Sequence, residues 1–279
     1  MAPRPLVSVL IRTMGRATLA RSIVAVASQT HRPLEIVVVN AAGKPLPALP
    51  PTNGVAIRVV EGGPYNRPRA ANAALDNAAG DWLIFLDDDD AFAPTHVASL
   101  LAAAASSPGA RVAYSATATV DPDGKARKGI GAPFNRLHLF NGNYIPNCAA
   151  LFARSLVAEG ARFDERIPCY EDWDFIIQLA QRTHFVYTGV PTAFWFAYAG
   201  ESGAGLGENR RAGDTQPFYD MVTAKWAGPA EALRDQLRHH HGAARAAAAR
   251  REPRYERRHL DEITRLTEGA PQHGMRRED

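Results

Sequence analysis

The stretch Trp82-Leu83-Ile84-Phe85-Leu86-Asp87-Asp88-Asp89-Asp90 decides the fold class, because a continuously apolar run ends in four adjacent carboxylates. A short apolar run bounded by a Gly80-Asp81 turn is typical of a strand that is covered on both faces of a parallel sheet. The carboxylates therefore follow the carboxyl end of a buried strand. Open α/β sheets bind their ligands at that edge.

Strand-like and helix-like segments alternate around this run. The apolar, β-branched pattern predicts strands at residues 6–11, 34–39, 56–60 and 82–86. Apolar residues spaced three and four positions apart predict helices at residues 17–28, 68–79 and 94–104. This order implies right-handed crossovers and a Rossmann-like, doubly wound, mostly parallel sheet flanked by helices.

The second half of the chain is less regular. Its patterns predict a helix at residues 171–181, a long loop over the site at 129–147, and strands at 111–118, 149–153 and 192–198.

The expected organisation is one α/β domain over residues 1–200, divided into halves of about 1–110 and 111–200, followed by an extension over 201–279. The extension begins with a glycine-rich segment and ends in a helical stretch rich in Ala, Arg, Glu and His.

Composition narrows the class of protein. A chain of 279 residues that is 46% hydrophobic and 22% charged is long enough to bury a full hydrophobic core without disulfide bonds or structural metal ions. A formal net charge of +3 gives no indication of a nucleic-acid partner. Cys148 and Cys169 match no C-x-x-C spacing and fit a reducing compartment. Without a signal-peptide pattern or an apolar run of about eighteen residues, the sequence predicts a cytoplasmic protein with no transmembrane segment.

The acidic run predicts a metal site. Adjacent carboxylates repel one another by roughly 1 kcal/mol or more per close pair near a protein surface. A divalent cation relieves this repulsion, and oxygen ligands alone suit Mg²⁺ or Mn²⁺ better than Zn²⁺. Because side chains alternate along an extended segment, Asp87 and Asp89 point the same way and Asp88 points away. An alternative that stays open is an acidic loop whose last residue, Asp90, caps the next helix.

These segments together resemble the large inverting glycosyltransferase family two, which has the GT-A fold. The matching stretches are the opening strand at residues 7–13, the first helix with its closing Gln-Thr at 22–30, the second strand at 34–40, and the Asp-x-Asp-Asp with the Pro-containing helix start after it. The likeness covers about residues 5–198. It implies metal-dependent transfer of a sugar from a nucleotide diphosphate donor, expected to be UDP-linked, to an acceptor hydroxyl in glycan or polysaccharide biosynthesis.

The resemblance makes residues 1–110 the nucleotide-binding half and assigns the base to Thr13 and Asn40, with Arg16 as a further candidate. The family usually has Asp at the position of Asn40. Asn accepts hydrogen bonds but also donates them, so the preference for uridine stays open. A cap at the entry to the first helix is the alternative role of Thr13.

The family's Ala-Arg-Asn stretch, which carries a cation near the donor phosphates or ribose, is altered here. Asn72 matches, but Ala71 stands at the Arg position. Arg69 or Arg67 is expected to supply the cation, since a guanidinium reaches a phosphate from a neighbouring position.

Within the acidic run, the resemblance makes Asp89 the principal metal ligand and places Asp87 near the donor ribose and the metal. Asp88 is counted among the donor-site residues although its side chain is expected to face away. Asp90 is expected to brace the loop or cap the helix.

A second constellation, Tyr170-Glu171-Asp172-Trp173-Asp174, follows Phe163-Asp164-Glu165. The family carries Phe-Asp-Glu and then Glu-Asp opening a helix, and the Asp of that pair is its catalytic base, so the role falls on Asp172. A positioned carboxylate that accepts the hydroxyl proton typically contributes roughly 10²–10⁴-fold. Glu171 is expected to support the acceptor, and Trp173 either forms a sugar platform or belongs to the core. The alternative is that both acids only favour a helix N-terminus.

The implied mechanism is a single in-line displacement with inversion, in which the metal stabilises the departing nucleotide diphosphate. Arg210 and Arg211 are expected to close over the phosphates as a lid. Two other classes stay open: a sugar nucleotidyltransferase, although its glycine-rich phosphate loop is missing, and a non-catalytic nucleotide- or glycan-binding module derived from this fold. Acceptor (glycan, lipid-linked or small molecule), oligomeric state and peripheral contact with anionic lipid are also open.

Overall fold

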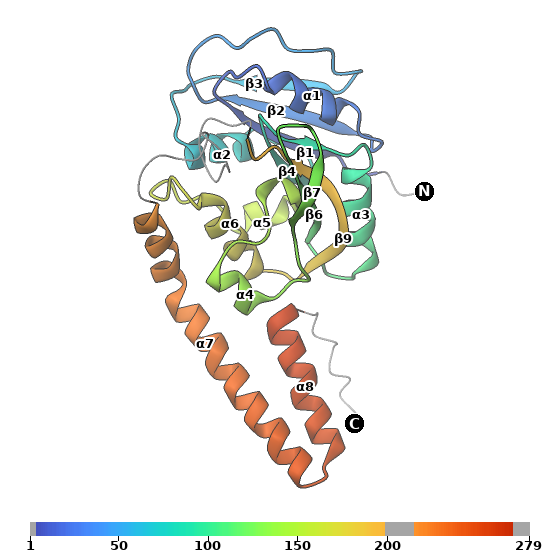
Figure 1. Cartoon of the computed structure of the whole chain (residues 1–279), viewed down its shortest axis with the longest axis vertical. Coiled ribbons are helices and arrows are strands. Elements are labelled where there is room, and N and C mark those ends of the chain that lie inside the picture. Colours follow the sequence, from blue (N-terminus) through green and yellow to red (C-terminus); the bar gives the residue numbers. More distant parts are fainter. Residues whose placement is uncertain (1–3, 199–214, 270–279) are drawn as a thin grey trace.

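The computed structural model of the chain describes residues 4–198 and 215–269. The segment that carries Arg210 and Arg211 lies outside the described residues. Within them, nine strands form one curled sheet in the order β3-β2-β1-β4-β8-β6-β9-β5, with β7 added beside β6. Helices cover both faces of the sheet, and a long helical hairpin extends from one end (Figure 1).

The first half follows the predicted alternation. Parallel pairing joins the strands β1 (Val7–Thr13), β2 (Leu34–Asn40), β3 (Ala56–Val60) and β4 (Trp82–Asp87). The helices between and after them are α1 (Leu19–Ala27), α2 (Arg67–Asp76) and α3 (His96–Ser106). The carboxyl ends of β1, β2 and β4 therefore meet at one edge, as the sequence predicts.

The second half completes the sheet with mixed pairing. Its strands are β5 (Ala91–Phe92), β6 (Val112–Val120), β7 (Ala126–Ile130), β8 (Ala150–Ala153) and β9 (Phe185–Trp195). Strand β8 lies antiparallel between β4 and β6, and β6 pairs in parallel with β9. Short β5 adds antiparallel to β9 just after the acidic run.

Two apolar layers pack on the two faces of the sheet. Along β1 the side chains alternate, so Val9 and Ile11 join the layer under α1 and α3, whereas Leu10 joins the other layer. That second layer contains α2 and α6 (Glu171–Ala180) and extends to the beginning of the hairpin. The two layers explain why the central strands are apolar throughout.

Two predicted boundaries are wrong. The expected loop at residues 129–147 contains α4 (Arg136–Asn141) and reaches the short 3₁₀ helix η1 (Asn147–Ala149). The side chain of Asn135 caps α4 by accepting a hydrogen bond from the His138 amide at 2.9 Å. Strand β9 begins at Phe185 and not at residue 192. The sequence pattern misses this start because the middle of the strand is exposed and lacks the apolar pattern of a buried strand.

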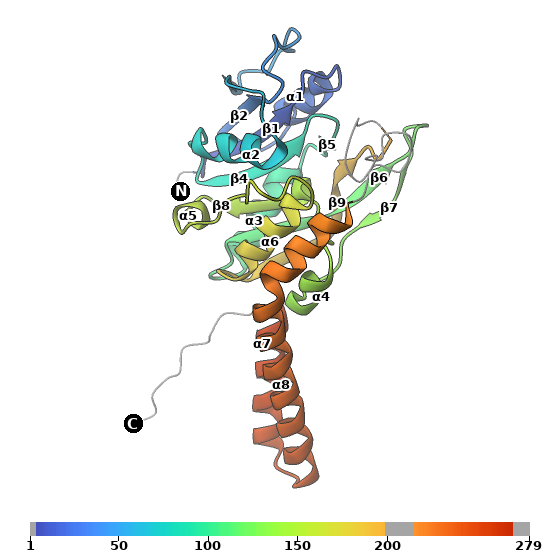
Figure 2. The same ribbon diagram turned by 90° about the vertical axis from the view of Figure 1, so that its left-hand side faces the viewer.

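The C-terminal extension is a hairpin of α7 (Gln216–Ala249) and α8 (Pro253–Glu268), and short α5 (Ser155–Ala158) lies elsewhere beside β8. The first part of α7 is integral to the domain, since Val222, Leu233 and Leu237 are buried in the main core. The far end of the hairpin projects away from the sheet (Figures 1 and 2). Among the described helices, none combines the length and the apolar character that a membrane crossing requires.

Candidate active site

A largely enclosed arginine, which the sequence does not single out, joins the two predicted acidic groups. Arg12 near the end of β1 lies beside Asp87 at the end of β4 in the parallel ladder. Its Nη2 donates to Asp87 Oδ1 at 2.8 Å, and its Nη1 donates to Glu171 Oε1 at 2.9 Å. The donor-side and acceptor-side carboxylates are therefore bridged by one guanidinium.

This bridge is strongly stabilised by charge. Burial alone would lower the pKa of Arg12, but the attraction of Asp87 and Glu171 outweighs it and raises the pKa. Removal from water likewise opposes the charged form of Asp87, yet Arg12, followed by Arg67 and Arg16, lowers the pKa of that carboxyl. Asp87 and Glu171 thus carry compensated negative charges.

Asp88 holds the loop between β1 and α1. Only 3% exposed, it accepts hydrogen bonds from the Thr13 hydroxyl at 2.6 Å and from Arg16 Nη1 at 3.0 Å. The Thr13 hydroxyl in turn accepts from the Gly15 amide at 2.9 Å. The polar side-chain atoms of Asp88 and Thr13 are thus engaged within the loop, and their contact with the donor stays a prediction. The alternative role of Thr13 as a helix cap is wrong.

Asp89 is more weakly compensated by arginine than Asp87 and Asp88. Its nearest cation is Arg16, whose Nη1 lies 3.6 Å from Asp89 Oδ2. Burial, with the repulsion of Asp87 and Asp88, raises the pKa of Asp89 to about 6. Asp90 braces the loop, since its carboxylate accepts from the Phe196 amide at 3.0 Å, and it does not cap α3.

Asp172 has no ion pair within the described residues. Its Oδ2 accepts from Asn143 Nδ2 at 3.1 Å, and its Oδ1 accepts from the Trp173 amide at 2.8 Å. Burial and the neighbouring charge of Glu171 raise the pKa of Asp172 to about 6, against the opposing effects of the Trp173 amide and Arg12. A carboxylate with this pKa is ionised at neutral pH and still basic enough to take a proton.

The backbone before Asp172 is strained. Tyr170 adopts φ 63° and ψ 21°, the left-handed region that a bulky residue rarely enters. Its ring packs edge-on against Trp173 and against Tyr219 of α7. Aromatic packing therefore holds the conformation that starts α6 at Glu171.

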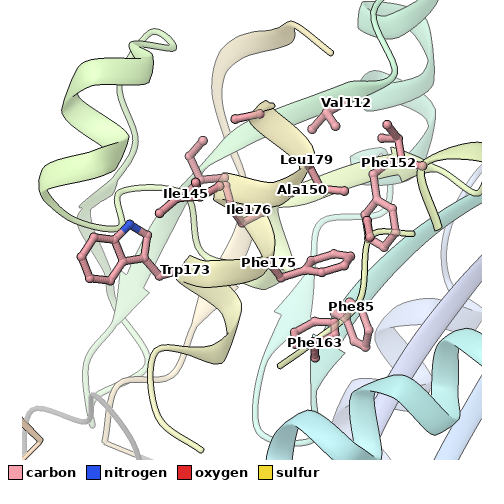
Figure 3. Packing of buried hydrophobic residues seen from close by; sticks show 14 of the residues in the cluster. Phe85, Val112, Ile145, Ala150, Phe152, Phe163, Trp173, Phe175, Ile176 and Leu179 are labelled. Carbon is pink, nitrogen blue, oxygen red and sulfur yellow. The ribbon is translucent and has the colours of Figure 1, made fainter. Parts of the chain in front are cut away.

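An aromatic cluster fixes the distance between the two acidic groups. Phe163 stacks on Phe175 of α6 with ring centroids 4.2 Å apart and meets Phe85 of β4 edge-on at 5.3 Å (Figure 3). Phe85 is two residues before Asp87, and Phe175 is three residues after Asp172. Close packing of these rings makes the relative position of β4 and α6 rigid.

Trp173 lies in the core, which is one of the two roles that the sequence leaves open for it (Figure 3). It is 1% exposed, and its indole nitrogen donates to the Leu139 carbonyl of α4 at 2.7 Å. The next acid, Asp174, is fully buried and accepts hydrogen bonds from Lys225 at 2.9 Å and Trp226 at 2.8 Å. Helix α7 is thereby tied to the helix that carries Asp172.

Asn40 presents a single acceptor. It is 1% exposed, and its Nδ2 donates to the Lys44 carbonyl at 2.6 Å and to Glu61 Oε2 at 2.8 Å. Its Oδ1 has no hydrogen-bond partner in the described structure. Since both amide protons are used, Asn40 can meet a ligand only as an acceptor, as an Asp would.

The residues predicted on α2 take other positions. Asn72 exchanges hydrogen bonds with the backbone of Phe163, both at 3.0 Å, and its contact with the donor stays a prediction. Arg69 is exposed, with its guanidinium over the Tyr65 ring. Arg67 is the α2 arginine that acts electrostatically on Asp87.

The chemistry of the donor set fits a divalent cation shared with a ligand. Asp87 and Asp89 offer only oxygen atoms, which Mg²⁺ and Mn²⁺ prefer. Among the described residues no group of three or more His, Cys, Asp or Glu can hold an ion by itself. Mg²⁺ is usually bound by one or two carboxylates, and substrate phosphates complete its coordination.

Comparison with known proteins agrees with this architecture. The model of the family described as "Glycosyl transferase family 2" matches residues 8–157. The "Uncharacterized glycosyltransferase YwdF" of Bacillus subtilis (strain 168) is 29% identical over 219 residues, which are 74% of this chain and 80% of that protein.

Solved structures of S. aureus TarS share the fold. TarS 1-349 superposes with a TM-score of 0.53 and 16% identity over 69% of this chain and 60% of TarS. Its complex with UDP superposes with a TM-score of 0.50 and 18% identity over 68% and 60%. Its complex with UDP-GlcNAc superposes with a TM-score of 0.50 and 16% identity over 68% and 58%. The chain thus spans about 60% of the length of these TarS chains.

Proposed function

The chain belongs to glycosyl transferase family 2 and is a glycosyltransferase, and we propose that it moves a sugar from a UDP-linked donor to an acceptor hydroxyl with inversion. The observation that carries the proposal is Asp172. This carboxylate has no ion pair with any described residue, its pKa is raised to about 6, and its helix is fixed against the strand that bears Asp87. Glycan or polysaccharide biosynthesis is the proposed setting.

The acceptor reaction follows from these residues. Asp172 takes the proton of the acceptor hydroxyl as the oxygen attacks the anomeric carbon, and the bond to the nucleotide diphosphate breaks on the opposite face. Glu171 is held by Arg12, so it is not free to act as a second nucleophile. Of this pair only Asp172 is without an ion pair to a described residue, which favours a single displacement and therefore inversion.

Asn40 supports a uracil base. Its Oδ1 is an acceptor without a partner, and uracil offers one N–H donor. The oxygen is enclosed, so we infer that the turn at residues 41–44 yields when the base binds. The TarS structures with UDP and UDP-GlcNAc show such donors bound on this fold.

Asp89 and Asp87 would hold Mn²⁺ or Mg²⁺ together with the donor phosphates. The cation supplies charge stabilisation to the leaving diphosphate when it is bound. Arg12 keeps Asp87 ionised and oriented. Burial and the neighbouring carboxylates raise the pKa of Asp89, so a bound cation would stabilise the ionised form of this carboxylate. Arg67 is the α2 cation best placed to assist near Asp87.

Thermal unfolding with nucleotide diphosphates tests the donor site. A ligand at a hundred times its Kd adds about 2.7 kcal/mol, which raises Tm by about 5–10 °C for a protein of this size. We expect a Mn²⁺-dependent rise with UDP that is lost in Asp89→Asn and kept in the surface control Asp76→Asn. No rise with any nucleotide would overturn the donor-site assignment, and a rise with GDP alone would overturn the uridine assignment.

A further inference from the structure

The far end of the hairpin is strongly basic. Within residues 245–258 every arginine is exposed, and only two acidic residues, Glu252 and Glu256, accompany them. We call this region the arginine tip; its arginines are Arg245, Arg250, Arg251, Arg254, Arg257 and Arg258. It lies where α7 turns into α8, at the end most distant from the sheet (Figures 1 and 2).

Most of this charge is uncompensated. Arg250 pairs with Glu252 at 3.0 Å, and Arg257 approaches Asp261 at 3.7 Å. The other four arginines of the tip form no ion pair with any described residue. Nearer the domain the pattern differs, since Arg238 of α7 pairs with Glu231 at 2.9 Å and Arg234 pairs with the same glutamate at 3.4 Å. A local surplus of positive charge indicates an anionic partner.

Apolar and amphipathic groups accompany the charge. Tyr255 is 60% exposed and Leu260 is 44% exposed. A hollow of about 450 Å³ opens between the helices, lined by Arg250, Glu252, Tyr255, His259 and the alanines Ala243, Ala246 and Ala247. Unpaired arginines beside the exposed Tyr255 and Leu260 suit a partner with a negative head and an apolar body.

Packing of the domain does not explain the tip. Beyond Leu237 the buried residues of α7 are only Ala244 and Ala247, which bury little apolar area. A hydrogen bond of 3.0 Å between His240 and His259 links the two helices there. The tip thus adds little to the core and is free to meet a partner.

We propose that the arginine tip docks this protein on an anionic lipid surface, a property beyond the proposed sugar transfer. Basic residues near such a surface each strengthen binding about fivefold, and Tyr and Leu insert at the boundary of head groups and acyl chains. A second copy of the chain is the weaker occupant, because two tips of the same sign repel each other. A purely acidic protein leaves the exposed Tyr255 and Leu260 unexplained.

Vesicle flotation with the full chain tests the proposal through a matched pair of variants. Arg254→Gln/Arg258→Gln removes two unpaired charges from the tip, and Arg234→Gln/Arg238→Gln removes two ion-paired charges from α7. The vesicles contain phosphatidylcholine alone or with phosphatidylglycerol. We expect binding only to the anionic vesicles, weakened roughly 20- to 30-fold in the tip variant, nearly unchanged in the control, and reduced by 0.5 M salt.

Several results would overturn the proposal. They are equal binding to both vesicle types, equal loss in the two variants, or no binding by the unmodified chain. A change of mass in sedimentation equilibrium for the tip variant alone, without a change in vesicle binding, would instead assign the tip to contact between copies. Equal melting temperatures of both variants serve as the folding control, so a loss of binding cannot be ascribed to unfolding.

Discussion

The two acidic groups of the site, the run Asp87–Asp90 and the pair Glu171–Asp172, are built on the same pattern. In the run, Asp87 is bound by Arg12 and Asp88 by Arg16, whereas Asp89 has only a contact at 3.6 Å. In the pair, Glu171 is bound by the same Arg12, whereas Asp172 has no ion pair within the described structure. Each group thus contains a carboxylate that an arginine compensates and one that is poorly compensated. Asp90 is a further poorly compensated acid, since burial and the charge of Asp89 raise its pKa well above the usual range, but its carboxylate braces the loop at Phe196.

The difference in compensation indicates which carboxylates hold the structure and which take part in the reaction. A compensated carboxylate is stable as it stands, and it holds a loop or a helix in place. Asp89 and Asp172 both have a pKa raised to about 6, and residues with such perturbed pKa values cluster at functional sites. We therefore expect substitutions at Asp89 and Asp172 to affect turnover, and substitutions at their compensated neighbours to affect mainly binding and stability.

The largest effect is expected at the acceptor side. Asp172→Asn removes the proton acceptor and should lower kcat by roughly 10²–10⁴-fold with little change in the KM for the donor. Glu171→Gln keeps an oxygen that accepts from Arg12 and should cost about tenfold or less. Steady-state kinetics of both variants compares them, and a greater loss in Glu171→Gln would reverse the assignment of the base.

The donor side should follow. Asp89→Asn weakens the place proposed for the cation and should lower kcat about 100-fold or more at fixed Mn²⁺. Asp88→Asn disturbs the loop after β1 and should mainly raise the KM for the donor. A Mn²⁺ titration of both variants distinguishes them, and unchanged activity in Asp89→Asn would argue against a metal at this carboxylate.

A substitution at Asn143 tests whether its hydrogen bond to Asp172 sets the pKa of that carboxylate. Asn143→Ala removes the hydrogen bond that stabilises the charged form of Asp172, so the pKa of the base should rise by roughly one pH unit. Activity at pH 6 should fall several-fold and recover at pH 8. Asn141→Ala on neighbouring α4 is the control, and a loss that persists at pH 8 would indicate a structural role alone.

The smallest effect on turnover is expected at Asp174, the fully compensated acid of the same helix. Trp226→Phe removes one hydrogen bond to its carboxylate and should cost about 2 kcal/mol, or about 4–8 °C in Tm. The kcat below the melting range should not change. Tyr255→Phe on exposed α8 is the thermal control. A large loss of kcat would show that α7 sets the position of Asp172.

Much of the fold was predictable, because the buried strands β1, β2 and β4 are continuous apolar runs. The carboxyl-end rule then brought the acidic run to the ligand edge of the sheet. The exposed middle of β9 carries no such pattern, and α4 is too short to show a helical period. Helix α7 continues past Pro229, which no local signal predicts.

The functional residues that stand next to one another in the sequence, such as the acidic run, could be predicted. Those whose role depends on partners far away in the sequence could not. Arg12 was missed because its partners are 75 and 159 positions away. Asn143 was missed because it lies in a stretch without periodicity. For Trp173 the sequence leaves a sugar platform and the core open, and only tertiary packing decides for the core. The hydrogen bonds of Asn72 to the distant Phe163 backbone have no local signal either.

The pH dependence of kcat with saturating donor, acceptor and Mn²⁺ addresses the role of Asp172. A bound cation lowers the pKa of Asp89, so the acid limb then reports the acceptor side. We predict that kcat is level above pH 7 and falls tenfold per pH unit below an apparent pKa of about 6, and that the residual activity of Asp172→Asn lacks this limb. A flat profile between pH 5 and 8, or the same limb in Asp172→Asn, would contradict the assignment of Asp172 as the base.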